Sequence, residues 1–184
     1  MLRVPACHVR SKNAKGLVSG EDARIGLERE RMRRERLVRK ALQRYWRWQR
    51  ALTLGVRGMI LDEAGRVLLI RHTYTPGWLF PGGGVELRET LLEALRRELM
   101  EEANVALTGQ PELFAIYSNE HAFPGDHVAL YVVRQWSQSG MPKPNLEIAE
   151  AGFFAPDALP EGTTAGTRRR LDEYANGLTP GEMW

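Results

Sequence analysis

Short apolar runs separated by turn residues follow one another from Thr53 onward. The runs 52–61 and 66–72 enclose the turn Asp-Glu-Ala-Gly, in which Gly65 suits the position that needs a positive φ, so we expect a β-hairpin. Three later runs are further strand candidates: 111–118, 127–136 and 149–156. The stretch 137–148 holds two prolines and a glycine and is expected to be a loop.

Two segments of this region have helical periodicity instead. Thr90 and Glu93 have the spacing of a capping box, in which each side chain satisfies a free backbone N–H group of the other residue. The residues that follow predict a helix with one buried apolar face: Leu91, Leu92, Leu95 and Leu99. Residues 163–177 predict a shorter helix that ends at Gly177. The order of elements therefore predicts an α+β domain that opens on a hairpin.

The first 50 residues have a different texture. Residues 21–50 contain no proline and one glycine, and their partly helical apolar spacing predicts a long basic amphipathic helix. We expect three parts: a disordered leader (1–20), a basic helical arm (21–50) and a domain (51–184). Both Met1 and Met32 are candidates for the biological start.

Charge separates the arm from the domain. Residues 1–50 hold 15 Lys and Arg against 5 Asp and Glu, whereas residues 51–184 hold 11 against 18. Five roles for the arm stay open. It could be a solvated helix whose Tyr45, Trp46 and Trp48 dock on the domain, a contact with a second subunit in a homodimer, or an anchor for an anionic membrane surface. It could also bind nucleic acid or another protein.

Composition excludes several classes of protein. With 43% hydrophobic and 8% aromatic residues, the chain is neither collagen-like, mucin-like nor wholly disordered. It has no run of 18 uncharged apolar residues and no secretory signal pattern at its start, so we expect a cytoplasmic protein, peripheral to the membrane if the arm binds lipid. Cys7 is the only cysteine, which excludes an intrachain disulfide and a cysteine-rich zinc site.

Three carboxylates share one face of the helix that is predicted to start after Thr90. Glu98, Glu101 and Glu102 are spaced i, i+3 and i+4, beside the apolar stripe. Like charges this close need compensation, and oxygen ligands at this density suit Mg²⁺ or Mn²⁺. The glycines of the preceding segment, 82–84, bring bare backbone next to the carboxylates, where carbonyl groups can join a metal and N–H groups can approach phosphate.

The spacing of these residues resembles the Nudix box of the Nudix hydrolases, G-x5-E-x7-R-E-U-x-E-E-x-G-U, where U is a bulky aliphatic residue. Eight of its nine specified positions agree: Gly83, Glu89, Arg97, Glu98, Leu99, Glu101, Glu102 and Val105. The exception is Asn104, where glycine is usual; Asn is the next best residue for the left-handed conformation that ends a helix. The resemblance covers residues 52 to about 175 and leaves out the arm.

The resemblance implies an α/β/α sandwich around a mixed β-sheet, and hydrolysis of a nucleoside diphosphate linked to another moiety with a divalent metal, Mg²⁺ or Mn²⁺. On the matching positions, Glu98, Glu101 and Glu102 would hold the metal, assisted by the backbone carbonyl of Gly82 or Gly83. Arg97 would pair with Glu89 as a structural brace.

The general base is expected to be Glu98. Its competitors are Glu150, Glu147 and Glu120, and Glu150 could instead be a further metal ligand. Weaker candidates for substrate contact are Arg71, Trp78, Tyr74 and Glu120, because a cation can meet phosphate and an aromatic ring can stack on a base. The sequence thus predicts a Nudix pyrophosphohydrolase. The alternative is a non-catalytic Nudix-fold module that binds nucleotides or regulates, with the arm as membrane or nucleic-acid anchor.

Overall fold

The structure is a computed structural model that describes residues 32, 33, 36, 40 and 52–184. The predicted leader and nearly all of the predicted arm lie outside these residues. The described domain contains the following elements in chain order: β1 (Thr53–Ile60), β2 (Val67–His72), β3 (Trp78–Leu79), α2 (Leu91–Ala103), β4 (Val105–Leu107), β5 (Glu112–Ser118), β6 (Asp126–Val133), β7 (Trp136–Gln138), β8 (Ile148–Phe154) and α3 (Ala165–Ala175).

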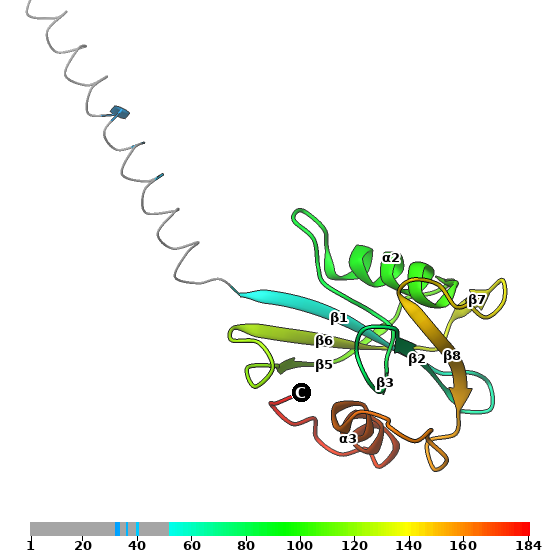
Figure 1. The fold of residues 1–184 in the computed structure, drawn as a ribbon. Coiled ribbons are helices and arrows are strands. Elements are labelled where there is room, and N and C mark those ends of the chain that lie inside the picture. Colours follow the sequence, from blue (N-terminus) through cyan, green and yellow to red (C-terminus); the bar gives the residue numbers. More distant parts are fainter. Residues whose placement is uncertain (1–31, 34–35, 37–39, 41–51) are drawn as a thin grey trace, which may run out of the picture. The chain divides into compact units, whose positions relative to one another are not determined.

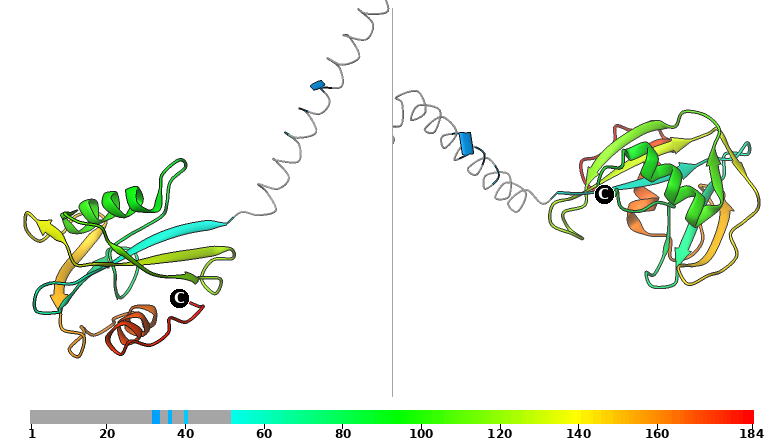
Figure 2. Two further views of the ribbon diagram at one scale, coloured as in Figure 1. Left: turned by 180° about the vertical axis from the view of Figure 1, so that it is seen from behind. Right: turned by 90° about the horizontal axis from the view of Figure 1, so that it is seen from above.

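The strands form three small sheets that lie between two helices. Their orders are β1-β6-β5, β3-β2-β8 and β4-β7. The first sheet is mixed, because β1 runs parallel to β6 while β5 runs antiparallel to it. Helices α2 and α3 cover opposite sides of these strands (Figure 1), and the views from behind and above agree (Figure 2). The predicted α+β sandwich with a mixed sheet is therefore confirmed.

The predicted hairpin between β1 and β2 is wrong in its pairing. The turn forms, with Gly65 at φ 72°, but a single bridge between Leu61 and Val67 joins the two runs. The reason is that both edges of β1 have other partners. One edge pairs with β6, and the other receives the glycine-rich segment, since Val56 N–H donates to the Gly83 carbonyl. Strand β2 pairs instead with β3 and β8.

Helix α2 begins and ends as predicted. Both hydrogen bonds of the Thr90–Glu93 capping box are present, and Asn104 ends the helix at φ 54°, in the left-handed region. Leu95 and Leu99 are fully buried against the sheets. Because Leu99 lies on Gly58 of β1, where an added Cβ would come within 2.9 Å of its side chain, the helix packs close to the strand. This packing fixes where the carboxylates of α2 point.

The remaining elements complete two apolar cores. Strand β7 takes up the start of the stretch predicted as a loop and pairs with β4. Helix α3 begins after Thr164, which caps it. Its Leu171 packs into the core that contains Met59, Leu69 and Phe80. Among the residues that the structure describes, no helix combines the length and apolarity needed to cross a membrane.

Candidate active site

The glycine-rich segment runs beside β1 as an irregular extra strand. Gly58 N–H donates to the Pro81 carbonyl and Val85 N–H to the Leu54 carbonyl, in addition to the bond to Gly83. Gly82 has φ 139°, and a side chain there would overlap the carbonyl of Val56 and approach the Cα of Arg57 to 2.9 Å. Only glycine permits this approach, so the sequence places bare backbone directly under α2.

Glu98 lies against this backbone. A Cβ added to Gly83 would come within 2.6 Å of the carboxyl carbon of Glu98. One carboxylate oxygen, Oε1, accepts a hydrogen bond of 2.7 Å from Nη1 of Arg97. The side chain is about one-eighth exposed, at 13%. Glu98 is therefore held at the glycine segment by packing and by one ion pair.

Arg97 ties the loop before α2 to the helix. Its Nε and Nη2 donate to the two carboxylate oxygens of Glu89, both at 2.9 Å, and Nη2 also donates to the Gly84 carbonyl at 3.1 Å. These hydrogen bonds lower the pKa of Glu89 and raise the pKa of Arg97. Glu101 stands on the outer side of the helix, exposed and 3.6 Å from Nη1 of Arg97.

Glu102 is the buried carboxylate of the box, only 3% exposed. Its Oε2 accepts a hydrogen bond of 2.6 Å from the N–H of Gly82, and its Oε1 lies 3.2 Å from Nε2 of His72. Burial raises the pKa of Glu102 to about 7, although the Gly82 N–H opposes this shift. Glu98 thus meets Gly83 and Glu102 meets the adjacent Gly82, whereas Glu101 faces solvent.

A second set of side chains gathers at Glu102. Its carboxylate, the ring of His72 and the carboxylate of Glu147 each offer a ligand atom, and these atoms lie within 4.8 Å of one another. Tyr74 donates its hydroxyl hydrogen to Glu147 at 3.1 Å. Of the three competitors for the role of general base, Glu147, in the loop before β8, is therefore the one that the fold brings beside the box.

Other residues singled out from the sequence have different surroundings. Glu150 lies opposite Arg71 across the β2–β8 pair and forms an exposed ion pair with it at 2.9 Å. Trp78 is buried and packs edge-on against Phe154. Glu120 accepts the N–H of Gly125 within the β5–β6 loop. None of these contacts joins the carboxylates of α2.

Arg57, on β1, was not singled out from the sequence. Its Nη1 donates to the carbonyl of Phe80 at 3.0 Å and also to the carbonyl of Gly82. Burial lowers its pKa, against the opposing effect of the nearby Glu102 and Glu98 carboxylates. The signal available in the sequence was an arginine in the middle of an otherwise apolar strand, LTLGVRGMIL. Such a residue needs a polar partner inside the fold.

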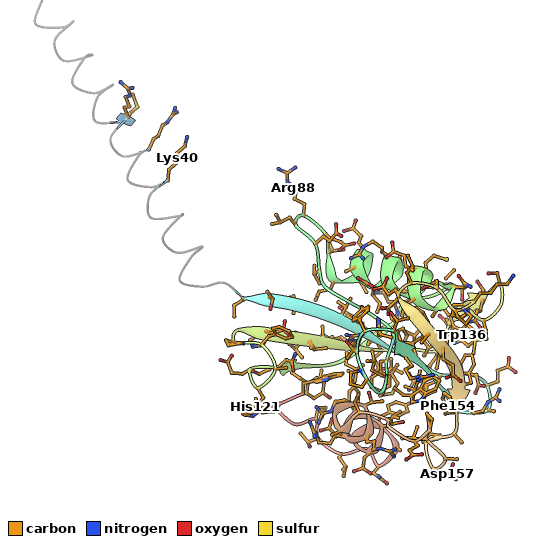
Figure 3. All side chains as sticks on the ribbon, in the orientation of Figure 1. Lys40, Arg88, His121, Trp136, Phe154 and Asp157 are labelled. Atoms are coloured by element: carbon orange, nitrogen blue, oxygen red, sulfur yellow. The ribbon has the colours of Figure 1, made fainter. Side chains whose placement is uncertain are left out.

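Two of the cavities in the described domain bear on the choice of a ligand site. The larger, of about 880 Å³, lies at the β1–β2 turn, where its arginines, Arg66 and Arg134, are paired with acids. A smaller one, of about 340 Å³, is lined by Arg57, Gly83, Gly84 and residues of the β5–β6 loop. Trp136 of the larger cavity and His121 of that loop lie toward opposite ends of the domain (Figure 3). We assign the smaller cavity to the site because it adjoins the box.

The residues at the glycine segment suit a hard divalent cation. The donors are carboxylate and carbonyl oxygens, which Mg²⁺ and Mn²⁺ prefer. The missing side chain of Gly83 leaves the Glu98 carboxylate in contact with the backbone, a place that any Cβ would fill. The carbonyls of Gly82 and Gly83 already accept hydrogen bonds from Arg57 and Val56, but a carbonyl oxygen has a second lone pair for a cation.

The chain is similar to several known proteins. A MutT-like protein of Streptomyces ambofaciens is 27% identical over 128 residues, which are 70% of this chain and 80% of that protein. An RNA pyrophosphohydrolase of Halorhodospira halophila is 34% identical over 85 residues, or 46% of this chain and 38% of that protein. The crystal structure of a MutT NUDIX hydrolase from Burkholderia pseudomallei has a TM-score of 0.56 and 28% identity, and the match covers 65% of this chain and 95% of that one.

The family model for the NUDIX domain matches residues 51–174, which include every position of the box and all strands of the domain. The fold, the arrangement of the box and this match together show that the chain belongs to the Nudix hydrolase family.

Proposed function

We propose that this chain is a divalent-metal-dependent hydrolase that cleaves the pyrophosphate bond of a nucleoside diphosphate linked to another moiety. The observation that carries the proposal is the meeting of Glu98 and Glu102 at the Gly82–Gly83 backbone, next to a cavity. Residues 51–184 are the hydrolase domain in this proposal. The alternative, a non-catalytic binding module, is disfavoured because every carboxylate of the box is present.

Mg²⁺ or Mn²⁺ would be held by Glu98, Glu101 and Glu102, with the carbonyl oxygen of Gly82 or Gly83. When bound, the cation screens the charge of the pyrophosphate and lowers the pKa of the attacking water. Glu101 would have to turn inward from its exposed position near Arg97. Glu98 and Glu102 need no such movement to face the glycine segment.

The chain's own residues would supply the base and its orientation. We propose Glu98 as the general base, because Arg97 and the Gly83 backbone hold its carboxylate in one place. Of the other candidates, Glu147 has more support than Glu150, since Glu150 is occupied by Arg71 on an exposed surface. Glu147 lies with Glu102 in the cluster of ligand atoms and is oriented by Tyr74.

The experiment is a substrate panel for the full chain with Mg²⁺ or Mn²⁺. It includes nucleoside triphosphates, ADP-ribose, a nucleotide sugar and RNA with a 5′-triphosphate, each scored for release of phosphate, pyrophosphate or nucleotide. Glu98→Gln and Glu102→Gln should each lower turnover by at least ~100-fold, the scale of a lost electrostatic stabiliser. Glu86→Gln, which changes an exposed carboxylate in the loop before α2, is the matched control and should keep its activity. Absence of metal-dependent hydrolysis across the panel would favour the binding module.

We also propose a role for the arm, 21–50, as a contact for a polyanion, in a chain that acts in the cytoplasm. The support is its concentration of positive charge, which in the sequence precedes an acidic domain. Among the open roles we favour nucleic-acid binding, because one relative is an RNA pyrophosphohydrolase. Salt-sensitive binding of the full chain to RNA, but not to vesicles of anionic lipid, is the expected result. Binding to vesicles would instead make the chain peripheral to a membrane, and a concentration-dependent mass would reveal a homodimer.

A further inference from the structure

We infer that Arg57 binds a phosphate group of the ligand that occupies the cavity beside the glycine segment. The inference rests on the proposed function, which makes that ligand a pyrophosphate compound. It adds a positively charged side chain that lies outside the Nudix box and that the sequence analysis did not single out.

The first support is the position of the guanidinium group. Arg57 lies on β1, and its side chain lines the cavity together with Gly83 and Gly84. The carboxylates of Glu98 and Glu102 meet the backbone of the same segment. A phosphate held at Arg57 would therefore be next to the carboxylates that are proposed to hold the metal.

The second support is the unused hydrogen-bonding capacity of Arg57. Nη1 donates to the carbonyls of Phe80 and Gly82, which fixes the plane of the guanidinium group. Within residues 52–184, neither Nε nor Nη2 of Arg57 has a hydrogen-bond acceptor. Neither atom is among the buried side-chain atoms that lack a partner, so both are accessible to a ligand. These N–H groups are thus free to donate to two oxygens of one phosphate, which is the geometry that arginine favours.

The third support is charge. In the part of the chain that the structure describes, no carboxylate lies within 4.0 Å of the Arg57 guanidinium group, although the group is half-buried. The acid in the same cavity, Asp126, is already bound by the hydroxyl of Thr53 at 2.6 Å and the amide of Asn119 at 2.8 Å. A partly desolvated cation without an ion-pair partner gains from an anionic ligand.

Arg71 shows the contrast. It is the arginine that the sequence favoured for phosphate contact, but Nη2 of Arg71 donates to Glu150 at 2.9 Å and both side chains are about half exposed. An exposed arginine with an acid partner gains less from a phosphate than a half-buried one without a partner. The structure therefore shifts the assignment from Arg71 to Arg57.

The test is binding of methylenediphosphonate, a pyrophosphate analogue that cannot be hydrolysed and carries no base, to the full chain in EDTA. Isothermal titration calorimetry would compare the wild type with Arg57→Met and Arg57→Lys. Arg57→Met should weaken binding about 10- to 100-fold, the range for a lost charge-assisted hydrogen bond. Arg57→Lys should weaken it less, because the charge remains while the two-pronged geometry is lost. Arg66→Met, which removes a half-exposed arginine at the β1–β2 turn, is the matched control and should bind as the wild type does.

Each outcome is decisive. Wild-type protein that does not bind the probe, or Arg57→Met protein that folds and binds it as tightly, overturns the inference. If Arg57→Met does not melt cooperatively, Arg57→Lys decides, and unchanged affinity in that variant overturns the inference as well. Binding that depends on Arg57 in a chain that hydrolyses nothing would support the inference and overturn the proposed function. Hydrolysis by a chain whose binding of the probe does not depend on Arg57 would support the proposed function and overturn the inference.

Discussion

Glu102 of α2 and His72 of β2 meet inside the domain, with Oε1 of the glutamate 3.2 Å from Nε2 of the histidine. Both side chains are less than one-tenth exposed. Burial raises the pKa of Glu102 to about 7 and lowers the pKa of His72. Without a cation, the fold therefore disfavours the charged form of each partner.

The first prediction concerns Glu102→Gln in EDTA. The pKa of Glu102 is about 7 in the folded protein and near the ordinary 4.5 when unfolded. Between these values the folded state holds a proton that the unfolded state has released, so the free energy of unfolding falls as pH rises. Glu102→Gln removes this loss. The variant should melt at or above the wild type at pH 8, and its advantage should shrink toward pH 5.

Thermal unfolding at both pH values measures this difference. Glu86→Gln removes an exposed carboxylate of the preceding loop and should show no such dependence on pH. An advantage of Glu102→Gln that grows as the pH falls would contradict the buried environment of Glu102.

A second prediction concerns Arg97, which holds Glu89, Glu98 and the Gly84 carbonyl together. Arg97→Ala should lower the free energy of unfolding by about 1–3 kcal/mol, since it leaves partly buried carboxylates without their donors. Turnover should fall too, because Glu98 loses its orientation. Arg96→Ala, one residue earlier and exposed, should change neither quantity appreciably. Denaturant unfolding and turnover of both variants provide the check, and equal behaviour would refute the brace.

The third prediction follows from the glycine segment. Gly82→Ala should strongly destabilise the domain, because the new Cβ would overlap the Val56 carbonyl and φ 139° is unfavourable for alanine. Gly84→Ala is the matched control, since a Cβ at Gly84 meets nothing within 4 Å. Melting temperatures of the two variants should differ widely. Similar values would mean that the segment can move away from β1.

The fourth prediction tests the residue in which the box departs from its pattern. Asn104 sits at φ 54° at the end of α2, so Asn104→Ala should cost about 1–2 kcal/mol of stability for the left-handed conformation. Asn104→Gly should be close to neutral, because glycine adopts this conformation freely while the variant loses only the bond to the Gly140 carbonyl. Chemical denaturation distinguishes them. A more stable alanine variant would contradict the role of this position as a helix cap.

Local features of the site could be predicted from the sequence. The capping box of Thr90 and Glu93, the left-handed Asn104 and the shared helix face of Glu98 and Glu102 depend on residues at most four positions apart. Hydrogen bonds and side-chain neighbours over so short a distance follow from helix geometry alone. The periodicity of the apolar runs likewise located most strands and both helices of the domain.

Tertiary structure decided which distant residues join that helix. Arg57, His72 and Glu147 come from β1, β2 and the loop before β8, and their approach to the glycine segment depends on how these elements pair and on the register of each pair. The same pairing separates β1 from β2 and joins Arg71 to Glu150. Because a one-residue shift of register turns every side chain of a strand to the opposite face, local periodicity alone cannot specify these contacts.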